Sequence, residues 1–151
     1  MARSIAFAND HAAAQLKGVL MDWARGRGHA VTDLGSDGST SVDYPDYGFA
    51  LAREVAAGRA DVGVALCGSG VGISIAVNRV AGCRCALVSD PLTARLSREH
   101  NDSNVVAMGA RLIGPDMAIA CLDAFLATDF AGGRHQRRID KLSASPEELS
   151  A

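Results

Sequence analysis

Short apolar runs alternate along the chain with longer segments whose apolar residues recur every three or four positions. The short runs are typical of buried strands, and the longer segments are typical of helices that bury one face. The predicted strands cover residues 4–8, 29–34, 61–66, 84–88 and 105–108. The predicted helices cover residues 12–25, 45–57, 73–77, 92–99, 115–126 and 134–142.

Strict alternation of strand and helix predicts a parallel sheet with helices on both faces. The fold class expected is therefore α/β, a three-layer αβα Rossmann-like fold with a five-stranded parallel sheet. A chain of 151 residues is most simply one domain, spanning 1–151.

The third predicted strand runs into a glycine-rich loop with the sequence Cys67-Gly68-Ser69-Gly70-Val71-Gly72. The glycines permit a sharp turn and close approach of a ligand to the backbone, and the N–H groups at the following helix start attract negative charge. The same positive end of the helix should favour the thiolate form of Cys67. Cys67 is thus a candidate base or nucleophile, and a tight turn around a buried structural cysteine is the alternative.

Other glycine loops do not fit this stretch. The third glycine of a dinucleotide fingerprint would fall at Ile73, and no Gly-Lys-Ser/Thr follows as in a Walker loop. A phosphatase-type thiol cradle would want an arginine soon after the cysteine, but the first one is Arg79. Nicotinamide and flavin cofactors are therefore not expected.

Polar residues follow other predicted strands. Asp10 and His11 follow the first strand, where ligands of α/β sheets gather, although a helix cap and a surface residue would explain them equally. Asp43 and Tyr44 are possible substrate contacts after the long loop 35–43, and a turn with a helix start is the alternative.

The basic segment near the C-terminus is predicted to be helical over about 134–142. Arg134 and Arg138 are four residues apart, so they share a helix face and could hold one phosphate or carboxylate together. A solvated basic helix that pairs with acidic surface residues or with a neighbouring subunit is the alternative.

Composition narrows the function. A net charge of −2 argues against a general nucleic-acid or membrane-surface binder. The four cysteines show no Cys-x-x-Cys spacing, and the chain shows no secretory signal or bilayer-length apolar span, which predicts free thiols in a reducing cytoplasm. No cluster of metal ligands is evident, so no metal is expected.

Several separated motifs together resemble the ribose-5-phosphate isomerase B family, which includes the galactose-6-phosphate isomerase subunits. The match runs from the first strand to about Leu142. The motifs that carry it are Asn9-Asp10-His11, Asp43-Tyr44-Pro45, the segment from Cys67 to Ser74, the segment from Ser97 to Asn104, Gly109-Ala110-Arg111, and the segment from Gly132 to Arg138.

The resemblance implies cofactor-free aldose–ketose isomerisation of a phosphorylated sugar, in a homodimer or dimer of dimers with active sites between subunits. The C-terminal helix is then expected to contact the partner subunit. Family members with a loop glutamate differ from this chain, where Ile73 and its neighbours are not acidic, so it resembles the thiol-dependent branch.

Roles are carried onto matching positions. Cys67 resembles the base, Ser69 lies near the reacting oxygens, and His100 resembles the group that opens the sugar ring, assisted by Asp10. The remaining substrate contacts expected are His11, Tyr44, Gly68, Gly70, Val71, Gly72, Asn101, Arg111, Arg134 and Arg138, with His11, Arg134 and Arg138 holding the phosphate.

The expected reaction interconverts ribose 5-phosphate and ribulose 5-phosphate through an enediolate. Alternatives are the same chemistry on galactose 6-phosphate, allose 6-phosphate or a tetrose phosphate, a Cys–His hydrolase with Cys67 attacking a carbonyl carbon, and a sugar-phosphate sensor without catalysis.

Overall fold

A single parallel sheet of five strands organises the chain, in the order β2-β1-β3-β5-β4. The computed structural model describes residues 1–150. The strands are β1 (Ser4–Asn9), β2 (Ala30–Asp33), β3 (Val62–Cys67), β4 (Cys85–Leu87) and β5 (Val105–Gly109). Because β1, β3 and β5 lie side by side and run in the same direction, Asn9, Cys67 and Gly109 end at one edge, the carboxyl edge of the sheet.

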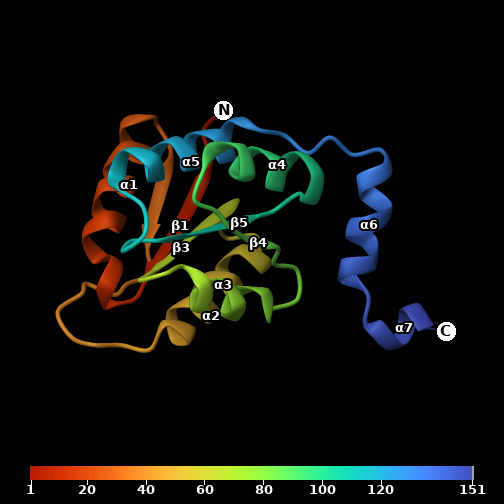
Figure 1. Ribbon diagram of the computed structural model, residues 1–151, viewed down its shortest axis with the longest axis horizontal. Helices are drawn as coiled ribbons and strands as arrows, with labels where there is room; N and C mark the ends of the chain where they lie inside the picture. The colour runs from red at the N-terminus through yellow and green to blue at the C-terminus, as the bar shows by residue number, and fades with distance from the viewer. Residues whose placement is uncertain (151) are drawn as a thin grey trace.

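Helices cover both faces of the sheet, as predicted (Figure 1). One face carries α1 (Ala14–Gly26), α4 (Pro91–Asn101) and α5 (Pro115–Ala127), and the other carries α2 (Tyr44–Ala56) and α3 (Val71–Asn78). A short 3-10 helix, η1 (His11–Ala13), precedes α1. The three-layer α/β architecture expected from the sequence is confirmed.

Alternating side chains on the strands build one core on each face. On β3, Val64 and Leu66 point toward α1 and α5, whereas Ala65 and Cys67 point toward α2 and α3. The second core is lined by small residues, and α2 crosses α3 so closely that a Cβ at Gly48 would lie 2.9 Å from the Cβ of Ala76. The side chain of Cys67 therefore belongs to the α2/α3 face, directly under the start of α3.

The last two helices are α6 (Arg134–Ser143) and α7 (Pro146–Ser150). Figure 1 shows α6 beyond the β4 side of the sheet, with α7 at the C-terminal end, and α6 contacts α4. Ile139 is the buried residue of α6, whereas Leu142 is exposed. No helix among residues 1–150 combines the length and apolar character that crossing a bilayer requires.

Most element boundaries shift by one or two residues from the predicted ones, and three differences matter. Cys67 is the last residue of β3 rather than the first of a loop. The fourth helix was expected to end at residue 99 but runs to Asn101, so it contains His100. The short α7 was not predicted. Residue 151, included in the predicted domain, lies outside the described residues.

Candidate active site at the carboxyl edge of the sheet

The glycine loop wraps around the sulfur of Cys67. Cys67 is 4% exposed, and the N–H of Gly70 donates to its Sγ at 3.1 Å. Gly70 has φ +77°, and a Cβ there would lie 2.8 Å from the carbonyl carbon of Met108. Only glycine fits this turn, because any side chain would require both a left-handed backbone and a collision with β5.

The loop lies directly on the end of β5. A Cβ at Gly109 would lie 2.6 Å from the carbonyl carbon and oxygen of Ser69. The motif Gly109-Ala110-Arg111 predicted no role for this glycine, and the close contact with Ser69 explains why a larger residue would not fit there.

Two of the predicted N–H donors are already used within the loop. The N–H of Gly70 is taken by Cys67 Sγ, and the N–H of Val71 donates to Ser69 Oγ at 3.2 Å. These two N–H groups are therefore engaged within the loop itself. Gly68, Ser69 and Gly72 remain as candidate donors, together with the Ser69 hydroxyl.

Tyr44 and Arg111 cover the two ends of the loop. A Cβ at Gly72 would lie 2.5 Å from Cζ of Tyr44, so the tyrosine ring lies against this glycine. At the other end, a Cβ at Gly68 would lie 3.2 Å from Nη1 of Arg111, whose own N–H donates to the Gly68 carbonyl at 3.0 Å. The structure thus brings an aromatic ring and a guanidinium to the loop from distant parts of the chain.

Asp10 and His11 reach the same edge from β1. The Asp10 N–H donates to the carbonyl of Leu66 at 3.1 Å, next to Cys67, and its Oδ1 accepts the N–H of Ala12 at 3.0 Å. Asp10 is therefore a helix cap, as the simpler interpretation held, and it is also a neighbour of the loop. Nδ1 of His11 accepts the N–H of Val42 at 3.1 Å, which leaves Nε2 to carry the ring proton.

Asn9 is the first residue of the motif Asn9-Asp10-His11, which predicted no role for it. It is fully buried, and its Nδ2 donates to the Asp10 carbonyl at 2.7 Å. Its Oδ1 has no partner among the described residues. Asn9 thus fixes the peptide group between Asp10 and His11, which hydrophobic patterning could not reveal because the residue lies at a strand end.

The other predicted residues lie elsewhere on the chain. Helix α4 starts after β4 at the carboxyl edge and runs back across the sheet, and its 11 residues span about 16 Å. His100 and Asn101, in its last turn, therefore lie toward the opposite, amino edge of the sheet. Within one chain they are not brought to Cys67, and neither are Arg134 and Arg138 on α6.

His100, Asn101, Arg134 and Arg138 form a second group, which His135 joins through contact with His100. The rings of His100 and His135 stack with centroids 4.5 Å apart and an interplanar angle of 16°. Desolvation and the positive charges of His100, Arg134 and Arg138 lower the pKa of His135.

The described part of the chain contains no group of three or more His, Cys, Asp or Glu side chains suited to a metal ion. The four cysteines are free thiols.

Comparisons with known proteins show the family of the chain. Residues 5–142 match the family described as Ribose/Galactose Isomerase. The ribose-5-phosphate isomerase B of Escherichia coli (strain K12) is 44% identical over 142 residues, which are 94% of this chain and 95% of that protein.

Two solved structures are similar over nearly the full length. The ribose-5-phosphate isomerase B of Clostridium thermocellum superposes with a TM-score of 0.93 at 42% identity, covering 98% of this chain and 99% of the other. The enzyme of the same name from Mycoplasma genitalium, solved with bound ribulose-5-phosphate, has a TM-score of 0.90 at 37% identity, covering 98% and 97%. The chain therefore belongs to the ribose/galactose isomerase family of sugar phosphate isomerases.

Proposed function

We propose that the chain interconverts ribose 5-phosphate and ribulose 5-phosphate. The observation that carries the proposal is the arrangement at the end of β3, where a thiol, N–H donors and the Arg111 guanidinium meet in one loop. The names of the similar enzymes from E. coli and M. genitalium support this substrate.

Cys67 acts as the base in this proposal. Isomerisation moves one proton from carbon 2 to carbon 1 and one hydroxyl proton between their oxygens, so the sugar neither gains nor loses electrons overall. Sγ takes the carbon proton and returns it to the adjacent carbon. The N–H of Gly70 donates to this sulfur at 3.1 Å and holds it at the end of β3.

The enediolate formed in between carries negative charge on oxygen. The N–H groups of Gly68, Ser69 and Gly72 are held around the loop before the reaction, so they can meet that charge without reorganisation. The loss of one such donor typically costs about 3 kcal/mol of barrier height.

A second copy of the chain completes the site. Ring opening needs an acid–base group, and His100 lies too far from its own Cys67 to supply it, so we place His100 and Asn101 of one copy at the loop of the other. Arg134 and Arg138 share one face of α6 and come with them, whereas His11 supplies its Nε2–H from the first copy to the same phosphate.

Exposed apolar side chains favour such a pair. Val71 and Ile75 lie one turn apart on α3, next to the glycine loop, and both are exposed, as is Leu142 on α6. Contact between two copies would remove this apolar surface from water. A dimer, or a dimer of dimers, is therefore the assembly proposed, in a cytoplasm that keeps the four thiols reduced.

The alternatives differ in measurable ways. A Cys–His hydrolase, with Cys67 attacking a carbonyl carbon, would form a covalent acyl intermediate, whereas the isomerase forms none. An isomerase for galactose 6-phosphate, allose 6-phosphate or a tetrose phosphate would share the loop chemistry. A comparison of kcat/KM across these sugars identifies the substrate, and a rank of ribose 5-phosphate well below another sugar would contradict the proposal.

The decisive test follows hydrogen exchange. In heavy water, the native enzyme should incorporate solvent deuterium into recovered ribose 5-phosphate at carbon 2. Cys67→Ala should lower kcat by about 100-fold or more with a small change in KM, because the base acts mainly in the transition state. Cys85→Ala, a thiol outside the loop, is the matched control. Full turnover in Cys67→Ala would exclude the thiol as the base.

A further inference from the structure

The C-terminal end of α4 contains an unusual backbone conformation. Asp102, the residue that ends the helix, has φ +44° and is the one non-glycine residue with positive φ among residues 1–150. Glycine or asparagine commonly takes this position, because an ordinary side chain in the left-handed region costs about 1 kcal/mol or more. Surrounding contacts must therefore hold Asp102 in place.

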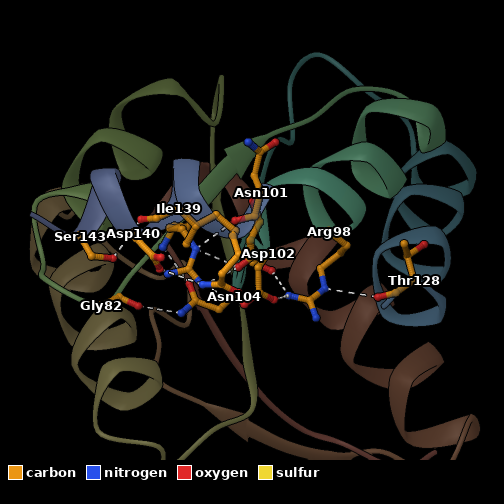
Figure 2. Close-up of polar contacts among 12 residues, drawn as sticks. Gly82, Arg98, Asn101, Asp102, Asn104, Thr128, Ile139, Asp140 and Ser143 are labelled. Carbon is orange, nitrogen blue, oxygen red and sulfur yellow. Dashed lines mark hydrogen bonds and ion pairs between the residues drawn. The ribbon is translucent and has the colours of Figure 1, made fainter. Parts of the chain in front are cut away.

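Two arginines, Arg84 and Arg98, supply those contacts, and Figure 2 labels Arg98 next to Asp102. The Asp102 carboxylate accepts Nη1 of Arg98 at 3.0 Å through Oδ1 and Nη2 of Arg84 at 3.1 Å through Oδ2. Arg84 also donates from Nε and Nη2 to the Asp102 carbonyl, at 3.0 and 2.9 Å, and from Nε to the Asn101 carbonyl at 3.0 Å. The last carbonyls of α4 are thus satisfied by a charged fork.

Arg84 is itself fixed to the sheet. Its N–H donates to Oδ1 of Asn104 at 2.8 Å, and Nδ2 of Asn104 donates to the carbonyl of Gly82 at 2.8 Å. The N–H of Asn104 donates back to the Arg84 carbonyl at 3.0 Å. The fork is therefore anchored where the chain enters β4 and β5, not on a free side chain.

Arg98 extends the same cluster to the segment that leads into α6. It is 8% exposed and donates to the carbonyl of Ser103, and from Nε to that of Thr128 at 3.4 Å, with its guanidinium above the ring of Phe125. A few residues on, the N–H of Ala131 donates to the carbonyl of Glu99 at 2.9 Å. The cluster thus ties the last turn of α4 to the connection between α5 and α6.

The cluster of Arg84, Arg98 and Asp102 lies next to residues of the second group. His100 and Asn101 immediately precede Asp102, and His135, which stacks on His100, lies at the start of α6. The cluster touches neither the glycine loop nor a substrate bound there. In the proposed dimer, the cluster sets how His100 and Asn101 of one copy face the glycine loop of the other copy.

We propose that Asp102, held between Arg84 and Arg98, is a positioning residue that orients His100 and Asn101 for ring opening. The inference rests on the proposed function, because it assigns Asp102 an effect on one step of that reaction.

Two sugars separate this role from general stability. Ribose 5-phosphate is closed into a ring by its carbon-4 hydroxyl, whereas 4-deoxyribose 5-phosphate lacks that hydroxyl and stays open. Asp102→Asn keeps the size and tolerates the left-handed backbone but loses the charge, and Asp102→Gly also relieves the strained φ. Both variants should lower kcat/KM about tenfold on the ring sugar and much less on the open sugar, because His100 is displaced rather than removed.

The matched control is Asp90→Asn, at the other end of the same helix, where Oδ1 of Asp90 caps the N–H of Thr93 at 2.8 Å. It should affect both sugars equally and weakly. An equal loss on both sugars in the Asp102 variants, or no loss on either, would overturn the positioning role, and Asp102→Asn decides if Asp102→Gly does not fold. Failure of the native enzyme on both sugars would instead refute the proposed function, and the inference with it.

Discussion

Substitution of Gly72 by alanine tests whether the tyrosine ring over the loop matters for turnover. A Cβ at Gly72 would lie 2.5 and 2.6 Å from Cζ and Cε2 of Tyr44, and its three nearest heavy atoms all belong to that ring. Ordinary van der Waals contact begins near 3.4 Å, so the ring must move by about 1 Å. The backbone does not have to move.

The cost to folding should be small. Tyr44 is 40% exposed, so its ring can swing toward solvent, and the overpacking penalty should be at the low end, about 1 kcal/mol. Alanine in a helix regains about 0.5–1 kcal/mol over glycine. These two terms nearly cancel, which leaves the free energy of unfolding changed by less than about 1 kcal/mol.

The cost to activity should be larger. Displacement of a substrate contact by this distance should lower kcat/KM about tenfold, equivalent to about 1.4 kcal/mol of transition-state stabilisation. Steady-state kinetics and urea unfolding of Gly72→Ala measure both effects. Gly18→Ala in α1 is the control, because nothing lies within 4 Å of its Cβ, and it should leave turnover unchanged.

The double variant identifies the cause. In a Tyr44→Ala background, Gly72→Ala should cost no further activity, because the ring that it displaces is already gone. A tenfold loss in both backgrounds would show that Gly72 acts through the backbone and that the interpretation of the Tyr44 contact is wrong.

Three further predictions concern stability and reactivity. Gly70→Ala, unlike Gly72→Ala, should destabilise the fold by about 2 kcal/mol or more, because φ is +77° and the Cβ would collide with the Met108 backbone; an unchanged urea midpoint would contradict this. Burial would raise the pKa of Asp33, but hydrogen bonds from Lys17 and the Gly35 N–H outweigh it and hold that pKa below its ordinary 3.8. Asp33 therefore stabilises the fold above about pH 4, and that contribution is lost as the pH falls through its folded pKa, so the difference in unfolding free energy between the native chain and Asp33→Asn should shrink as the pH is lowered below 4, and a difference that does not change with pH would contradict this. Burial and the nearby charge of Asp90 raise the pKa of the Cys121 thiol to about 11, so alkylation of the folded protein at pH 8 should spare Cys121, as mass spectrometry of peptides would show.

Sequence patterns predicted which residues lie near one another at the carboxyl edge of the sheet. Parallel strands end together, so polar residues and glycines that follow β1, β3 and β5 had to meet, and Asp10, Cys67 and Arg111 do so. The spacing of apolar residues likewise predicted that each helix buries one face. What local patterns could not give is which distant residue touches which glycine, as with Tyr44 on Gly72.

The residues at the end of α4 show a second limit. The sequence placed His100 after a helix, whereas it lies inside the last turn of α4. Arg84 donates to the Asn101 carbonyl in that turn, which satisfies a group that has no partner within the helix. The left-handed Asp102 depends on the same long-range contacts. The Arg98 contact is local, four residues away, but the Arg84 contacts have no local signal, since Arg84 is 18 residues away from Asp102.

Mixing two inactive variants tests most directly whether the two halves of the site meet between copies. Cys67→Ala and His100→Ala each remove one half, and each should be inactive alone on ribose 5-phosphate. After dissociation and random reassociation in equal amounts, half of the dimers contain both variants, and one of their two sites is intact, which restores about a quarter of native activity. A mixture as inactive as its components would contradict the shared site.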